Sequence, residues 1–307
     1  TCALQAQKPA FNPQSSVGQL YEYSEFAKVE NSDLSIDELL KSSTLNFEEL
    51  SSANHDLGFT SDSYWVRFKL KNTSKESETY YLETARPITD VVKLYQIGQG
   101  QGIKTYKSGD QIPFSERDVA HRQTVFNIEL PPKSEQQFYL NLKSDGETIN
   151  LPLNLYSEIE FFKENYKQQL FLGLFYGLLF LAGLIYLFFY NSLKNKAFLY
   201  YGLYVFSIAL MQAALDGFIY QYFLPGGGYL NSRMVLISAI FSNFFLLKYC
   251  EYFLNVDTYL PKFKKAYKLI YVLVGVSFVM LFISPKTLEL AYPFCNLNGL
   301  LSLILIL

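Results

Sequence analysis

Apolar and polar positions divide the chain into two parts. Residues 170 to 190 form an apolar run that is rich in Leu, Phe and Gly and has no charged side chain. A helix rises about 1.5 Å per residue, so a run of this length spans about 30 Å, the thickness of the hydrocarbon core of a bilayer. We therefore expect a membrane crossing here, with a water-soluble part before it and a membrane part after it.

Four more apolar segments follow the first crossing. They are too long for strands, and helices keep every backbone hydrogen bond within the segment where no water is present. The expected membrane region is 170–307, with helices at about 170–190, 197–215, 234–254, 269–283 and 290–307, the fourth of them short. Because the sequence stops inside the last apolar run, we expect this region to be incomplete.

Basic residues are distributed unevenly between the connections of these helices. The connections on one side carry seven lysines, which are Lys194, Lys196, Lys248, Lys262, Lys264, Lys265 and Lys268. The connections on the other side contribute only Arg233 and Lys286. By the positive-inside rule, the lysine-rich connections face the cytoplasm. The part before residue 170 then lies outside the cytoplasm.

In this outer part, apolar positions follow the period of a strand. One face of the segment 64–71 carries Tyr64, Val66, Phe68 and Leu70, and the other carries Trp65, Arg67, Lys69 and Lys71. Further strands are expected at 79–84, 90–97, 102–106, 122–130, 136–143 and 148–155, with turn residues between them. Such short strands predict an all-β, jelly-roll-like sandwich in residues 8–157, ahead of an α-helical multi-span transmembrane bundle.

Two shorter helices are also expected. Ser35 and Glu38 have the spacing of a capping box at the start of a helix through residue 40. Residues 158–169 are polar and helix-compatible, and they lead into the first crossing without Gly or Pro. A stiff helical junction of this kind would carry a shift of the sandwich into the membrane. The alternative is that this juxtamembrane helix is a passive spacer.

The two parts differ in charge. Residues 1–169 carry 24 acidic and 17 basic side chains, whereas residues 170–307 carry 4 acidic and 9 basic ones. The soluble part is therefore acidic and would be repelled by phosphate, so nucleic acid is not an expected partner of this portion.

Cysteine and histidine carry little chemistry in this sequence. Cys250 and Cys295 lie in or beside membrane segments, so no pair within the soluble part could form a disulfide. His55 and His121 have no Cys or clustered carboxylate partner at metal-ligand spacing. We expect no metal site, no cofactor and no catalytic residue in this portion, because its paired carboxylates lie in polar loops.

The first residues resemble a processing site. Residues 1–7, with a small Ala6, are similar to the end of a secretory signal peptide that is cut near Ala6, and we expect a signal-peptide remnant there. Cys2 could instead be a lipidation site, so whether it is lipidated or removed stays open.

Few features inside the membrane region suggest transport or catalysis. Lys248 and Glu251 lie at the cytoplasmic end of one segment, three residues apart, where snorkelling or a local pair explains them. Gly173 and Gly177 form a G-x-x-x-G spacing on the first helix, which would let another helix approach closely. A homodimer would use that spacing, but glycine-bearing membrane helices also show it by chance.

In order, these segments resemble a bacterial family, the seven-transmembrane receptors with diverse intracellular signalling modules, in the class with a type 2 extracellular domain. The matching stretches are 58–72, 82–95, 108–114, 121–122 with Phe126, 151–153, 173–191, 200–201 and 217–225. The resemblance implies a jelly roll similar to carbohydrate-binding modules that senses a small ligand, with carbohydrates as one class. It also implies a bacterial inner-membrane protein with seven helices and a C-terminal kinase, cyclase or phosphatase module outside this sequence.

Ligand-binding candidates are polar or aromatic residues that the core does not need. Trp65 and Arg67 share one strand face, where an aromatic plane beside a guanidinium suits a sugar ring or a carboxylate. Arg86, His121 and Arg122 lie at strand ends or in loops. The alternative is structural: Trp65 packs under a loop, Arg67 pairs with Glu83 across strands, and His121 fills a turn.

The leading functional hypothesis is a transmembrane signalling receptor with a periplasmic sensor domain. A membrane transporter or enzyme with an accessory β-domain is one alternative, which would require ionisable residues in further helices. A surface glycan-binding or assembly protein is another, although five crossings exceed what anchoring needs.

Overall fold

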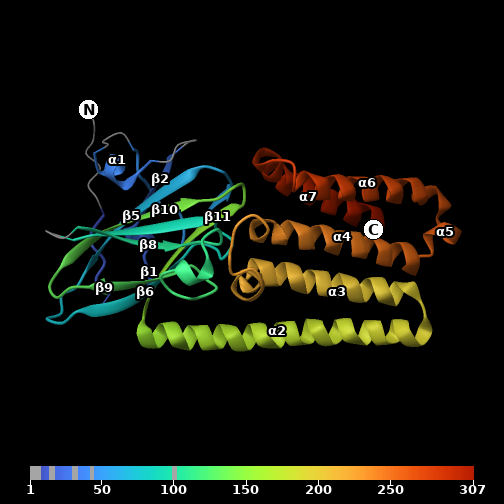
Figure 1. Ribbon diagram of the computed structural model, residues 1–307, viewed down its shortest axis with the longest axis horizontal. Coiled ribbons are helices and arrows are strands. Elements are labelled where there is room, and N and C mark those ends of the chain that lie inside the picture. The colour runs from blue at the N-terminus through green and yellow to red at the C-terminus, as the bar shows by residue number, and fades with distance from the viewer. Residues whose placement is uncertain (1–7, 14–17, 30–33, 42–44, 99–101) are drawn as a thin grey trace. The chain divides into compact units, whose positions relative to one another are not determined.

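A computed structural model describes residues 8–13, 18–29, 34–41, 45–98 and 102–307. The chain forms two compact units (Figure 1). The first holds the described residues up to Asn165 together with Tyr220–Gly228, and the second holds Tyr166–Ile219 and Tyr229–Leu307. The expected signal-peptide remnant, residues 1–7 with Cys2, lies outside the described residues.

The first unit is a sandwich of two antiparallel sheets. Its strands are β1 (Gly18–Gln19), β2 (Glu25–Val29), β3 (Glu48–Glu49), β4 (Asn54–Phe59), β5 (Ser63–Lys71), β6 (Glu78–Thr84), β7 (Val91–Ile97), β8 (Ile103–Ser108), β9 (Val125–Leu130), β10 (Glu135–Lys143) and β11 (Thr148–Ser157). One sheet has the order β3-β2-β5-β10-β7-β8, and the other has the order β1-β11-β6-β9 with β4 also paired to β11. Successive strands cross repeatedly between the sheets, and the predicted jelly-roll-like sandwich is confirmed.

The alternation along β5 sets the two faces of its sheet. Tyr64, Val66, Phe68 and Leu70 are buried in the main core between the sheets. On the outer face, Trp65 is buried in a second cluster below the helix α1 (Ile36–Lys41), which contributes Leu39. The outer face of β5 is therefore covered around Trp65, whereas Lys71 at the end of the strand is exposed.

Capping boxes start two helices of this unit. At α1, the Ser35 hydroxyl donates to Glu38 Oε2 over 2.7 Å, and the Glu38 amide donates back to Ser35 Oγ over 3.3 Å. At α2 (Glu158–Leu193), Ser157 and Glu160 repeat the arrangement, with a hydroxyl-to-carboxylate distance of 2.9 Å. Strand β11 ends at Ser157, so the strand passes into the helix without a loop.

The second unit is helical. It contains α2 from Tyr166 onward, α3 (Lys196–Leu215), α4 (Met234–Phe253), α5 (Val256–Tyr259), α6 (Lys264–Met280) and α7 (Pro285–Ile306). Among the described residues, four helices are long and apolar enough to cross a membrane: Glu158–Leu193, Lys196–Leu215, Asn231–Phe253 and Lys286–Ile306. The fourth expected crossing, 269–283, falls on α6, which has 17 residues and is shorter than these four.

Within this unit, polar side chains pair locally. The Lys248 ammonium lies 2.8 Å from Glu251 Oε2, which confirms the expected local pair, and the Tyr271 hydroxyl of α6 donates to the same oxygen over 2.7 Å. Gly173 and Gly177 of α2 have no atom within 4 Å of an added Cβ. Within the described chain, no other helix packs closely against Gly173 and Gly177. A homodimer that packs on these two glycines stays a prediction.

Candidate ligand-binding pocket

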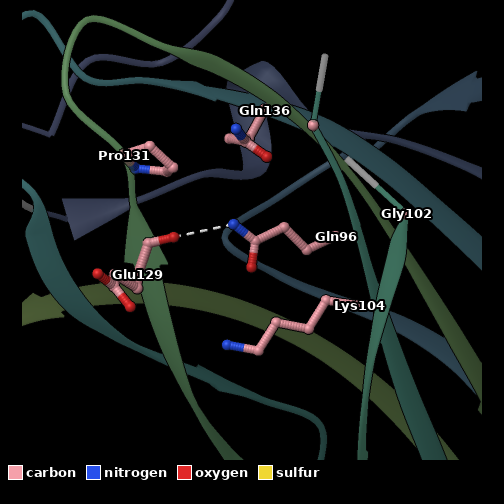
Figure 2. Close-up of a pocket in the computed structure, with 7 residues that line it drawn as sticks. Gln96, Gly102, Lys104, Glu129, Pro131 and Gln136 are labelled. Atoms are coloured by element: carbon pink, nitrogen blue, oxygen red, sulfur yellow. Dashed lines mark hydrogen bonds between the residues drawn. The ribbon is translucent and has the colours of Figure 1, made fainter. Parts of the chain in front are cut away.

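A polar pocket of about 240 Å³ opens at one end of the sandwich (Figure 2). Its lining comes from both sheets: β7, β8 and β10 of the six-stranded sheet and β9 of the other. The lining residues are Gln96, Gly98, Gly102, Lys104, Glu129, Pro131 and Gln136. None of them is aromatic, so the pocket offers hydrogen bonds and charges, and a stacking plane is not part of its lining.

Gln96 fixes one wall of this pocket. It follows Val92 and Leu94 on the inward face of β7, so the alternation that buries two apolar residues also buries an amide. Its Nε2 donates to the backbone oxygen of Glu129 over 2.9 Å, the bond drawn in Figure 2, and its Oε1 accepts from the Tyr106 hydroxyl over 2.7 Å. The amide therefore joins the two sheets and has one orientation.

Gln136 forms the neighbouring part of the pocket. It is 4% exposed, and a Cβ added at Gly98 would lie 2.7 Å from its Oε1. Only glycine at position 98 leaves room for the amide where it stands. The glycine that follows β7 thus leaves space for the buried amide of Gln136 beside that of Gln96.

Two charged side chains complete the lining. The Lys104 ammonium lies 4.7 Å from the centre of the Tyr106 ring, and the Ser77 hydroxyl donates to Glu129 Oε1 over 2.8 Å. Burial raises the pKa of Tyr106, which keeps its hydroxyl neutral and able to donate to Gln96. The pocket thus combines an exposed cation, an exposed carboxylate, the hydrogen-bonded amide of Gln96 and the buried amide of Gln136.

A second polar region lies at the other end of β7, in the turns that hold Asp90, Asp110, Asp145 and Glu147. The backbone amide of Asp145 donates to Asp90 Oδ2 over 2.6 Å. Burial, and then the charge of Asp145, raises the pKa of Asp90 to about 8. Burial also raises the pKa of Asp110, with Glu147 the next cause. No group of three or more His, Cys, Asp or Glu in the described chain has the arrangement of a metal site.

Comparison with known families decides what kind of protein carries this sandwich. The family model described as "7TMR-DISM extracellular 2" matches residues 22–157, and the one described as "7TM diverse intracellular signalling" matches residues 168–307. The chain belongs to this receptor family. It is a multi-pass membrane protein with an extracellular N-terminal domain, as the sequence predicted, and both matched domains are of receptor type.

Solved structures resemble the receptor only remotely. TmCBM61 in complex with beta-1,4-galactotriose has a TM-score of 0.25 and 8% identity, and the match covers 45% of this chain and 90% of that one. The enzymatically active domain of bacteriophage CBA120 tailspike protein 4 has a TM-score of 0.26 and 9% identity, covering 46% and 20%. At these scores the likenesses carry no functional argument. A search of curated proteins finds no match.

The structure of the receptor buries Trp65 in the cluster that includes Leu39 of α1, and places Arg67 on the same strand face. Trp65 is 1% exposed and stacks on Tyr95 with ring centres 5.6 Å apart. Arg67 donates to Glu25 Oε2 over 2.7 Å and covers the Phe47 ring at 4.0 Å. The structural alternative for Arg67 was wrong about its partner, since Glu25 on the neighbouring strand β2 replaces Glu83.

The other three predicted residues lie elsewhere. His121 accepts from the Gln123 amide at Nδ1, over 3.2 Å, so its Nε2 carries the proton toward Asn165 Oδ1, 3.1 Å away. Burial lowers the pKa of His121 and favours this neutral form. Arg122 is 4% exposed, and Arg86 is half-buried in a turn where its carbonyl accepts from the Thr89 amide.

Trp65 and Arg67 lie on the same face of β5, and His121 and Arg122 are adjacent in one loop. The pocket is lined by none of these four residues and not by Arg86. As ligand contacts they stay predictions. Sequence reasoning missed the pocket residues, although one signal was present: Gln96 occupies a position that the strand period assigns to the core.

Proposed function

We propose that this receptor senses a small polar ligand, with carbohydrate as the class, through the pocket between β7, β8, β9 and β10. It would do so on the periplasmic side of a bacterial inner membrane and relay binding through its helices to a cytoplasmic module. The observation that carries the proposal is a pair of buried amides, Gln96 and Gln136, that line the pocket beside Lys104 and Glu129. Hydrogen bonds hold the Gln96 amide in one orientation.

These groups suit a polyhydroxylated molecule. An amide both donates to and accepts from vicinal hydroxyls, a carboxylate accepts from them, and an ammonium adds a strong donor. Because Tyr106 and Glu129 already hold the Gln96 amide, ligand binding costs no conformational entropy for ordering this side chain. Without an aromatic lining residue, affinity would come from hydrogen bonds, which favours discrimination between hydroxyl arrangements.

Binding at this place would affect how the two sheets are held together. Gln96 belongs to one sheet, Glu129 belongs to the other, and a ligand between them would add a further link. Strand β9 pairs with β6, and β6 pairs with β11, which runs into α2 through the Ser157 cap. A change at the pocket thus has a path of paired strands to the first membrane helix.

The test is a thermal-shift screen of the full chain in detergent against mono- and oligosaccharides, organic acids and cell-wall fragments. The proposal predicts that a sugar raises the melting temperature. It also predicts that Lys104→Ala weakens binding by about tenfold, the equivalent of losing one charged hydrogen bond of about 1.5 kcal/mol.

Lys107→Ala is the matched control, because Lys107 lies on the same strand with its side chain on the opposite face. It should leave the shift unchanged. A shift that Lys104→Ala and Glu129→Gln both leave intact would place the ligand elsewhere, and the absence of any shift from sugars would reject carbohydrate as the ligand class.

A further inference from the structure

The segment between α3 and α4 packs on the sandwich. Residues Tyr220–Gly228, here called the α3–α4 segment, belong to the compact unit of the sandwich although they join two membrane helices in sequence. Tyr220 is 2% exposed and donates its hydroxyl to the Ile112 carbonyl. The Phe114 amide donates to the Pro225 carbonyl over 2.7 Å. Backbone groups of both partners therefore take part in the contact.

Arg117 holds Tyr220 from the sandwich side. Its guanidinium lies 4.7 Å from the centre of the Tyr220 ring, and the Phe114 ring meets the same ring edge-on at 5.5 Å. Arg117 is 6% exposed and is fixed by backbone carbonyls, with Nη1 2.6 Å from the oxygen of His121 and Nε 3.3 Å from that of Gly109. A buried cation fixed in this way gives the Tyr220 ring one defined position.

Gly227 makes the closest approach. Its φ is +65°, in the left-handed region, and an added Cβ would lie 2.5 Å from the Asp110 backbone oxygen. Gly228 also has a positive φ, of +79°, but an added Cβ there would have no neighbour within 4 Å. An alanine at either glycine would strain the backbone, but only an alanine at Gly227 would also collide with the sandwich. Comparing the two substitutions therefore distinguishes backbone strain from loss of close packing.

The same stretch of the sandwich holds the start of α2. Residues 109–124, here called the β8–β9 segment, contain Arg117 and also His121, which bonds Asn165 of α2 at 3.1 Å. The His121 ring meets Phe161 edge-on at 5.5 Å. Because Arg117 Nη1 bonds the carbonyl of His121, the two contacts share one hydrogen-bonded loop.

We propose that the β8–β9 segment is a docking surface for the α3–α4 segment of the same chain, and that it couples this segment and the start of α2 to the sandwich. A rearrangement of the sandwich then reaches the membrane helices at two points of the sequence, the first turns of α2 and the connection between α3 and α4. This inference rests on the proposed function only in taking the sandwich as the sensor, and it does not depend on the pocket or on a sugar.

The short helical turn at the docked segment fits such a role. Ile219–Phe223 forms a single π-helical turn, a rare geometry that is frequently found at functional sites. Burial raises the pKa of Tyr220, so its hydroxyl stays protonated and keeps donating to Ile112. Docking therefore does not change with pH through titration of Tyr220 near neutrality.

Amide hydrogen exchange on the full receptor in lipid nanodiscs, without any ligand, tests the docking. The proposal predicts that Gly227→Ala speeds exchange at residues 110–117 and 220–228 by at least tenfold, and also at the adjoining ends of α3 and α4. Gly228→Ala, the matched control, should change exchange at its own turn alone. Equal effects of the two substitutions, or no effect of either, would overturn the proposal.

A second pair of variants keeps the test independent of backbone strain. Tyr220→Phe removes the hydroxyl that bonds Ile112 and keeps the ring under Arg117, whereas Tyr222 is 66% exposed. We expect faster exchange at residues 110–117 in Tyr220→Phe and wild-type exchange in Tyr222→Phe. A receptor in which Gly227→Ala and Tyr220→Phe speed exchange as expected but which binds no sugar would reject the proposed ligand alone. A receptor that binds sugar but in which neither substitution changes exchange would reject the docking alone.

Discussion

At the scale of single residues, the most unusual feature is a set of buried carboxyl groups. Asp90 and Asp110 are each 3% exposed, and Glu147 is 2% exposed. Burial penalises a charged carboxylate, and neighbouring carboxylates add to that penalty. Asp90 with its partner Asp145 therefore holds a proton at neutral pH, where an exposed aspartate would have lost it.

This proton makes the stability of the sandwich depend on pH. The pKa of Asp90 is about 8 in the folded state, against an ordinary value of 3.8. The folded state thus binds more protons, so the free energy of unfolding falls as pH rises from about 4 to about 8, by at most about 1.4 kcal/mol per pH unit. Asp90→Asn should make this slope less steep in thermal unfolding of the full chain between pH 5 and pH 9, and Asp110 would account for a part that remains.

Glu48→Gln provides the control, because Glu48 is an exposed carboxylate on the edge strand β3. It should leave the slope as in the wild type. An unchanged slope in Asp90→Asn would mean that another group holds the proton.

At the scale of elements, the junction of β11 and α2 is built as one piece. The Phe161 ring, in the first turn of α2, stacks on Tyr81 of β6 with centres 4.5 Å apart and planes within 7°. Phe161 is 5% exposed, whereas its neighbour Phe162 is 43% exposed. The start of α2 is therefore packed on the sandwich, which is what a stiff junction requires.

This packing predicts different effects for two adjacent phenylalanines. Phe161→Ala should lower the free energy of unfolding of the sandwich by about 3 kcal/mol, the usual cost of removing a buried aromatic ring, and Phe162→Ala by well under half of that. Thermal unfolding of the two variants, followed by a sandwich-specific probe such as Trp65 fluorescence, measures the difference. Similar losses in both would show that the first turn of α2 is not packed as described.

Most strands and helices, and the faces that they bury, could be predicted from the sequence because they depend on local periodicity. The two-residue alternation from Tyr64 to Lys71 assigned the faces of β5, and the Ser35 and Glu38 spacing located α1. The polar stretch before the first crossing was rightly expected to be helical, and it is continuous with that crossing in α2. These signals lie within a few residues of one another.

What could not be predicted depends on pairing between distant residues. Alternation placed Trp65 on the outer face of β5, but it could not show that α1 covers that face. The polar pocket needs Glu129 of β9 beside Gln96 of β7, a meeting that strand order decides. No local pattern marks Tyr220 as a residue that docks on a loop more than one hundred positions earlier.

At the scale of the whole molecule, the sandwich of this receptor continues directly into α2, and it also holds the segment between α3 and α4. The positive-inside distribution of lysines and the family matches place that sandwich on the side of the membrane away from the cytoplasm. The pocket and the β8–β9 segment lie at different places in one sandwich, so ligand binding and its relay to the helices can be altered separately by mutation.

The most direct measurement is amide hydrogen exchange of the full receptor in nanodiscs with and without the tightest-binding sugar of the screen. We expect slower exchange on binding at residues 96–98, 102–104 and 128–136, which surround the pocket, and a changed rate at residues 220–228. Protection confined to the strand of Trp65 and Arg67, or around His121 and Arg122, would contradict the pocket and return the ligand site to the residues that the sequence first indicated.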